Sequence, residues 1–155
     1  MTSPEAVVAT LAAAPDVIVP MLREMPAARR TRRPAPDAWS AHEHVCHMAA
    51  VHPVFFERLD ILVNDPEPRI ASYLPSDEDE AGAFLDVDLE EALDRFVRDR
   101  AALVERLRAL SPQQWQRTAD HPEYDQYSTL IAFRHLALHD MMHGYHIEEA
   151  LLARE

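Results

Sequence analysis

The stretch STLIAFRHLALHDMMHGYHIEEALLAR, residues 128–154, decides the fold of this chain, because its apolar residues recur with the period of an α-helix. Ser128 is a suitable N-cap, and the pattern predicts a helix from there to near Arg154. Four histidines share the stripe that should face the core. The stripe consists of Ala132, His135, Leu136, His139, Met142, His143, His146, Ile147 and Ala150.

Further helices are predicted upstream of this stretch. The first begins at the pair Ser3-Pro4 and ends before Pro26, with Pro15 expected to kink it or divide it in two. Another covers residues 89–110, where apolar residues again recur with helical period. Residues 65–88 are acidic and lack sustained periodicity, which predicts a long connection containing at most a short helix.

The remaining helix begins with a capping box, in which Ser40 and Glu43 can each bind the other's backbone amide. It is expected to run without interruption to about Val63. His47 lies in the middle of its apolar stripe, and Arg58 shares that stripe. The apolar members of the stripe are Ala50, Val51, Val54, Phe55, Ile61 and Leu62.

Composition supports an all-α chain. Only 2 glycines occur against 12 prolines, whereas β-hairpins usually need glycine in their turns. A length of 155 residues suits one domain, taken as residues 1–155. The expected fold is therefore a single four-helix bundle.

The charge balance excludes some partners. With 27 acidic and 15 basic residues the formal net charge is −12, which repels nucleic acid and anionic membranes. The arginines at 29, 30, 32 and 33 are interpreted as a solvated connection. No continuous apolar run of about 20 residues and no leader-like N-terminus is found, and the lone Cys46 cannot form an intramolecular disulfide. We therefore expect a cytoplasmic protein without a membrane span.

The histidines suggest a metal site. His139 and His143 are one helical turn apart, so both imidazoles can bind one ion from a single rigid helix. His135 with His139 has the same spacing, and His143 with His146 is a looser alternative, so periodicity alone does not choose among these pairs. His47 is the preferred third ligand because of its central place on its own stripe. His44, about 60° from His47 on the same helix, remains a possible ligand, but both His42 and His44 are interpreted as surface or boundary residues.

Three neutral imidazoles suit Zn²⁺, Ni²⁺ or Fe²⁺ and leave a coordination position for water or substrate. Such a metal lowers the pKa of a bound water molecule or holds a thiol as thiolate. A metalloprotease is disfavoured, because His42-Glu43-His44-Val45-Cys46 lacks the second histidine of HExxH and Asp140 replaces its glutamate in the later motif. Histidines that merely pack in the core remain an alternative.

The motifs Trp39-Ser40-x-x-Glu43-x-x-x-His47 and His139-Asp140-x-x-His143 resemble those of the DinB superfamily, the DinB/YfiT-like four-helix bundles. The resemblance extends over nearly the whole chain and includes Arg58, Phe96, Arg100 and His121-Pro122. It implies an up-down-down-up bundle with the long connection between helices two and three, commonly a homodimer. It also implies that His47, His139 and His143 are the metal ligands, while His135 and His146 are less favoured.

The resemblance further implies a reaction class. Characterised relatives include transferases that use thiols such as bacillithiol or mycothiol, so the expected activity is transfer of a small-molecule thiol to an electrophile. A metal-dependent hydrolase is the runner-up, and a non-catalytic metal-binding module of the stress response is the third possibility. Asp140, Glu43 and Arg58 are candidates for positioning the ligands or moving protons, although the capping box gives Glu43 another role.

Overall fold

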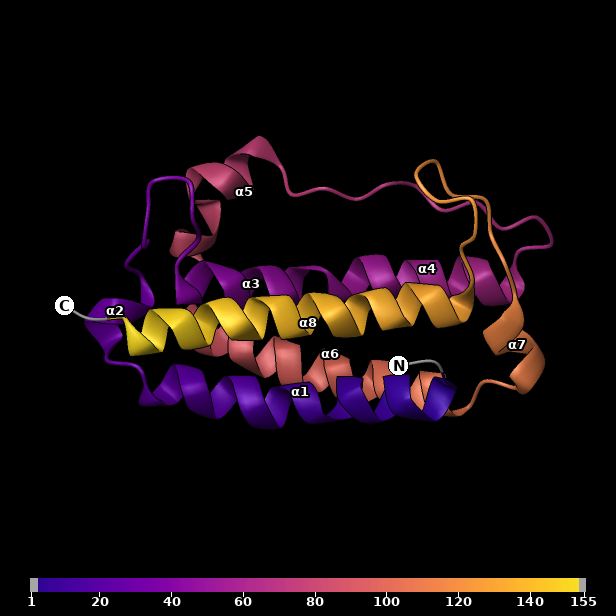
Figure 1. Ribbon diagram of the computed structural model, residues 1–155, viewed down its shortest axis with the longest axis horizontal. Helices are drawn as coiled ribbons and strands as arrows, with labels where there is room; N and C mark the ends of the chain where they lie inside the picture. The colour runs from indigo at the N-terminus through magenta and orange to yellow at the C-terminus, as the bar shows by residue number, and fades with distance from the viewer. Residues whose placement is uncertain (1–2, 154–155) are drawn as a thin grey trace.

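The computed structural model describes residues 3–153, and the described part is almost entirely helical. Four long rods lie side by side (Figure 1). They are α1 (Pro4–Glu24), α3 with α4 (Ala41–Ala50 and His52–Asn64), α6 (Leu89–Arg108) and α8 (Thr129–Leu152). The shorter helices are α2 (Ala27–Arg30), α5 (Asp77–Ala81), the 3₁₀ helix η1 (Ala83–Asp86) and α7 (Pro112–Gln116). The expectation of an all-α four-helix bundle is confirmed.

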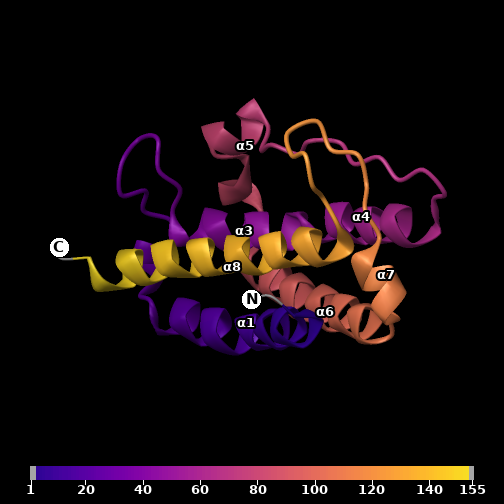
Figure 2. The ribbon, with the colours of Figure 1, turned by 45° about the vertical axis from the view of Figure 1, so that its right-hand side comes forward.

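The direction of each rod can be followed by colour in Figure 1. α1 and α8 run one way, whereas α3–α4 and α6 run the other, which gives the up-down-down-up order. Residues 65–88 return the chain along the bundle, because α4 ends at the opposite end from the start of α6. The long connections all gather over α3, α4 and α8, as Figures 1 and 2 agree. These connections therefore cover one side of the bundle, the side formed by α3, α4 and α8.

The predicted N-caps are present. The Ser40 hydroxyl accepts from the Glu43 amide at 3.3 Å, and the Ser40 amide donates to the Glu43 carboxylate at 2.8 Å. Ser128 caps α8 by accepting from the Ile131 amide at 3.2 Å, and Ser3 caps α1 in the same way. Each cap satisfies an amide that the first helical turn leaves unpaired, so these serines fix where the rods begin.

Of the two outcomes expected at Pro15, a kink or a division, the division does not occur, because α1 continues through Pro15 as one helix. A proline inside a helix removes the amide that would bind the carbonyl four residues earlier. That carbonyl belongs to Leu11, and Nη1 of Arg100 donates to it at 3.2 Å. A side chain from α6 thus supplies the hydrogen bond that the α1 backbone lacks.

The expectation of one uninterrupted helix over 40–63 is wrong at Val51, where α3 ends and α4 begins. Pro53 has no amide proton for the carbonyl of Ala49. Nδ1 of His52 lies 3.4 Å from that carbonyl, while Nε2 of His52 accepts from Nε of Arg100 at 3.1 Å. Because Nε2 is the acceptor, the proton of neutral His52 lies on Nδ1 and is directed to Ala49.

The apolar core divides into two clusters along the bundle. The cluster near α7 includes Val7, Leu11, Phe55, Leu59, Leu103, Leu107, Trp115, Tyr127, Phe133 and Leu136. The cluster near α2 and η1 includes Ile18, Leu22, Met25, Val45, Met48, Phe84, Leu93, Phe96 and Ile147. α1 packs against α6 and α8, and α3 also packs against both. The cluster near α2 and η1 therefore joins α3 to α8, and the cluster near α7 joins α4 to α8.

α1 also bears on the expectation that the chain has no membrane span. Within the described residues it is the one helix long and apolar enough to cross a bilayer by length and composition, with a mean hydropathy of 1.6 over 18 residues. The core helix of a soluble bundle passes the same test. In the bundle Val7, Leu11 and Leu22 of α1 are fully buried.

Candidate metal centre

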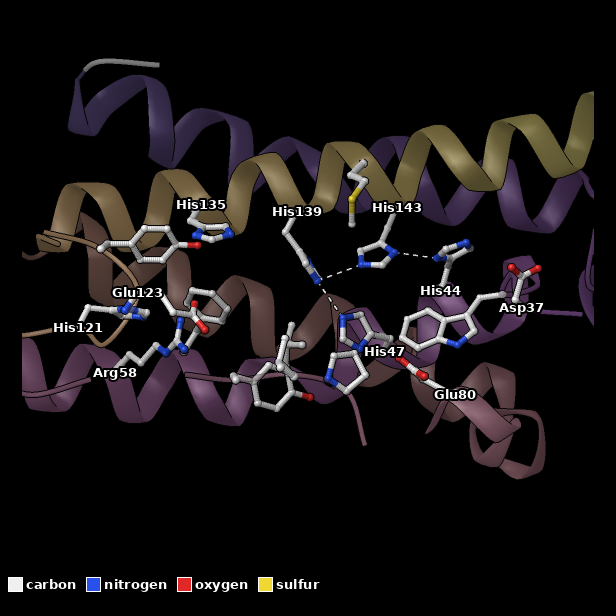
Figure 3. A pocket seen from close by; sticks show the side chains of 18 residues that line it. Asp37, His44, His47, Arg58, Glu80, His121, Glu123, His135, His139 and His143 are labelled. Carbon is white, nitrogen blue, oxygen red and sulfur yellow. Dashed lines mark hydrogen bonds between the residues drawn. The ribbon is translucent and has the colours of Figure 1, made fainter. Parts of the chain in front are cut away.

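Three histidines from two rods converge at one point of the structure (Figure 3). Nε2 of His47, on α3, lies 2.9 Å from Nε2 of His139, on α8. Nε2 of His143 lies 3.0 Å from the same atom. The candidate ligand atoms of the three residues all lie within 4.8 Å of one another. Among the described residues this is the single group of three or more histidine, cysteine or acidic side chains gathered in this way.

The proton count of this cluster favours a bound cation. A neutral imidazole carries one N–H and one acceptor nitrogen. Nε2 of His139 faces the Nε2 atoms of both His47 and His143, and its one proton or one lone pair cannot satisfy both neighbours. In addition, Nδ1 of His47 and Nδ1 of His139 are buried without a hydrogen-bond partner. With the proton of each neutral ring on Nδ1, all three Nε2 atoms present lone pairs to one point, and this donor set fits a divalent metal.

The imidazoles of His47 and His143 are kept neutral by their surroundings. Burial, followed by the neighbouring histidines, lowers the pKa of His47 to about 4. Burial also lowers the pKa of His143 far below its ordinary value, with contributions from His139 and His47. Metal ions bind the neutral imidazole, so these lone pairs are free at neutral pH without loss of a proton.

The interpretation of His42 and His44 as surface or boundary residues is wrong. Their relative exposures are only 7% and 8%. Nε2 of His42 lies 2.9 Å from the carbonyl of Val87, and Nδ1 of His44 lies 2.7 Å from Nδ1 of His143. The connection after α4 and the C-terminal half of α8 cover this face of α3, a tertiary arrangement that helical periodicity does not reveal.

The two alternative ligands lie outside the cluster. His146 is exposed, its Nδ1 lies 3.1 Å from the Glu149 carboxylate, and its ring stacks at 5.3 Å on His44. His135 is also exposed and lies toward the other end of the cleft, one turn before His139 (Figure 3). Of the histidine pairs that the sequence allowed on this helix, the structure therefore places only His139 and His143 together in the cluster.

Asp140 is turned away from the open site and is almost fully buried. Its carboxylate forms a bidentate ion pair with Arg100, in which Nη2 donates to Oδ1 at 3.2 Å. Oδ1 also lies 3.9 Å from Nδ1 of His139, which is beyond hydrogen-bonding distance. Burial alone would raise the pKa of Asp140, but His139 and Arg100 lower it. Asp140 thus places a fixed negative charge behind one candidate ligand.

Glu43 serves the fold at the start of α3. Besides the capping box, its carboxylate accepts from Nε of Arg33 at 3.0 and 3.1 Å. Burial raises the pKa of Glu43, but the bonds from Arg33 and Ser40 outweigh it and lower the pKa. Arg29 and Arg30 also bind backbone carbonyls, those of Leu151 and Met25. The interpretation of Arg29, Arg30 and Arg33 as part of a solvated connection is therefore wrong.

The histidine cluster lies in a cleft of about 660 Å³ between α3, α4, α8 and the connections above them (Figure 3). The ring of Trp39 covers His47 with centroids 4.9 Å apart. Arg58, which the sequence placed near the ligands, lies toward the opposite end of this cleft. The cleft is large enough for a small-molecule substrate rather than a single water molecule.

Cys46 is adjacent to His47 in sequence but does not line the cleft. It is buried, and burial raises the pKa of its thiol to about 12. Because the thiolate is the reactive form, alkylation of the native protein by iodoacetamide at pH 7.5 should be roughly a thousandfold slower than alkylation of the unfolded chain in urea. Mass spectrometry of timed samples measures both rates, and equal rates would contradict this placement of Cys46.

Comparison with known proteins agrees with this arrangement. The family model described as DinB superfamily matches residues 10–147. YfiT from Bacillus subtilis, described as a probable metal-dependent hydrolase with an unusual four-helix bundle topology, has a similar structure, with a TM-score of 0.81 and 19% identity over 97% of this chain and 89% of that one. TT2238, a four-helix bundle protein, superposes with a TM-score of 0.69 and 23% identity over 94% and 98% of the two chains. No curated protein sequence matches the chain. The chain belongs to the DinB superfamily.

Proposed function

We propose that this protein is a divalent-metal-dependent enzyme whose metal ligands are His47, His139 and His143. The observation that carries the proposal is the convergence of three imidazole nitrogens, with two orphaned Nδ1 atoms behind them, at a cleft of about 660 Å³. Membership of the DinB superfamily supports it. Zn²⁺, Ni²⁺ and Fe²⁺ all accept such a set of ligands.

The metal would lower the pKa of a thiol or water molecule that binds beside the three histidines. The residues of the chain supply the setting for that chemistry. The imidazoles of His47 and His143 hold their lone pairs without competing protons. Trp39 and Phe84 shield His47 from solvent on one side, with ring centroids 4.9 and 6.0 Å from that of His47. Arg100 and Asp140 keep the rods bearing the ligands in register.

The reaction that we favour is transfer of a low-molecular-weight thiol to a small electrophile. The single cysteine of the chain is buried with a raised pKa, so a sulfur nucleophile has to come from solution. The thiol loses its proton to solvent, its sulfur forms a bond to the electrophilic carbon, and the leaving group departs with the electron pair of the bond that breaks. The cleft has room for both reactants, which a site for water alone would not need.

Hydrolysis is the second candidate, and the description of YfiT as a probable metal-dependent hydrolase favours it. In that case water takes the place of the thiol and the same three histidines hold the metal. The two candidates differ in one measurable quantity, the consumption of added thiol.

The test is to load the protein separately with Zn²⁺, Ni²⁺ or Fe²⁺ and to supply a panel of thiols with monochlorobimane, followed by a panel of esters and amides without thiol. Fluorescent thioether formed by the parent, retained in His146→Ala and lost in His139→Ala, would support the transferase. Ester or amide hydrolysis with the same dependence would support the hydrolase instead. Metal-dependent stabilisation without turnover of any substrate would indicate a non-catalytic binding module.

His44 provides a prediction about the metal itself. For Nε2 of His143 to offer its lone pair, the proton of His143 has to lie on Nδ1, where Nδ1 of His44 can accept it at 2.7 Å. His44→Leu should therefore weaken metal binding about 10- to 100-fold. His44→Asn should largely retain it, because Oδ1 of asparagine can occupy the place of Nδ1. Competition with a chromophoric chelator measures both affinities, and equal losses in the two variants would contradict this role.

A further inference from the structure

The cleft has a second polar end, away from the histidine cluster. Arg58, His121, Glu123 and His135 line it, as Figure 3 shows. Tyr124 also lines the cleft, and its ring centroid lies 4.7 Å from that of His121. Eleven residues separate His47 from Arg58, which corresponds to about 16 Å of helix. The two ends therefore lie too far apart to contact the same atom of a ligand, but they belong to one continuous cleft.

Arg58 is held in place by neutral groups. Its Nη1 donates to the Tyr127 hydroxyl at 3.1 Å, and its Nη2 donates to the Ala71 carbonyl at 3.0 Å. Its guanidinium lies 5.2 Å from the centre of the Phe55 ring. A guanidinium has five N–H donors, and Tyr127 and Ala71 take two of those of Arg58, so three remain for a ligand. Because Arg58 is already held in one conformation, a ligand that binds it loses less conformational entropy of this side chain on binding.

Arg58 makes no ion pair with a carboxylate among the described residues, although the chain carries a net charge of −12. The nearby Glu123 carboxylate accepts instead from the Ser72 hydroxyl at 2.9 Å. His121 adds a second donor, because its Nδ1 accepts from the Glu123 amide at 3.1 Å and the proton of the neutral ring therefore lies on Nε2. Burial and Arg58 lower the pKa of His121, which agrees with a neutral ring.

We propose that this end of the cleft binds a carboxylate of the substrate, whose reactive atom lies at the three histidines. Arginine favours carboxylates because its planar N–H donors match both oxygens. Val51, Phe55 and Met142 line the cleft and offer an apolar path between its ends. The preferred ligand is a monoanion with an apolar spacer, since the charge of Glu123 opposes a phosphate dianion more strongly. This inference rests on the proposed function only in placing the reactive atom.

The test uses the metal-free full-length protein, so that no ion can hold the carboxylate. Octanoate, 1-octanol and octyl phosphate are titrated separately, and binding is followed by ¹H–¹⁵N NMR. We expect octanoate to bind at least tenfold more tightly than 1-octanol and more tightly than octyl phosphate. Equal affinities for octanoate and 1-octanol, or tighter binding of octyl phosphate, would overturn the proposal without requiring any variant.

Variants then locate the site. Arg58→Met should weaken octanoate binding at least tenfold and leave 1-octanol binding unchanged, while Arg58→Lys should fall between the parent and Arg58→Met. Arg106→Met is the matched control, because Arg106 also lies over a ring, that of Phe56 at 5.7 Å, but is exposed on α6. Undiminished octanoate binding in Arg58→Met would overturn the proposal. His139→Ala should lose metal binding but keep octanoate binding. This result would show that the carboxylate site at Arg58 does not depend on the metal site.

Discussion

Replacing His47, His139 or His143 by alanine is expected to abolish the stabilisation of the protein by a divalent metal. A ligand that binds only the native state stabilises it by about 2.7 kcal/mol at a concentration one hundred times its Kd. For a chain of this length that corresponds to a rise in Tm of roughly 5 to 11 °C. Each variant should lose this rise because two imidazoles remain where three converge. Calorimetry with and without metal, together with elemental analysis of the dialysed protein, measures the effect.

His135→Ala and His146→Ala are the matched controls, because both residues lie on α8 outside the cluster. Each should retain the metal content of the parent and its rise in Tm. Metal content that falls equally in all five variants would show that binding is not specific to the cluster. Absence of metal from the parent and from every variant would indicate histidines that only pack in the core.

Much of this site follows from the sequence because helical spacing is local. The pair His139 and His143 share a face whatever the rest of the chain does, and the capping box at Ser40 fixes the start of the helix that carries His47. The contact between His44 and His143 joins residues 99 positions apart, so no local pattern reveals it. It depends on how α8 packs against α3, which only the tertiary structure determines.

The prolines also show where prediction from the sequence ends. Pro15 and Pro53 each remove a backbone hydrogen-bond donor from a helix, and the sequence does not show what replaces it. In the structure Arg100 donates to the Leu11 carbonyl, and His52 is directed to that of Ala49. α1 therefore stays continuous where a break was a reasonable expectation, and the helix after Ser40 divides where none was expected.

Arg100→Met and Asp140→Asn are each expected to lower the free energy of unfolding by about 3 to 5 kcal/mol, because each leaves the other charge buried without its partner. Both side chains are at most 3% exposed. The corresponding fall in Tm is roughly 6 to 20 °C. Urea unfolding of the metal-free protein measures the change, so that altered metal binding does not contribute. Arg106→Met, which breaks the exposed pair with Asp60, should cost at most about 1 kcal/mol.

Arg100 contributes to stability through its hydrogen bond to the Leu11 carbonyl and through its ion pair with Asp140, and Pro15→Ala separates the two contributions. Alanine at this position restores the backbone amide that the Leu11 carbonyl lacks, so Arg100 is no longer needed as its donor. In that background Arg100→Met should cost about 1 kcal/mol less than in the parent, the usual contribution of one hydrogen bond. Asp140→Asn should cost the same in both backgrounds, because it leaves the bond from Arg100 to Leu11 in place. A reduction of equal size for both substitutions would mean that Pro15→Ala stabilises the bundle generally and that Arg100 acts only through its ion pair.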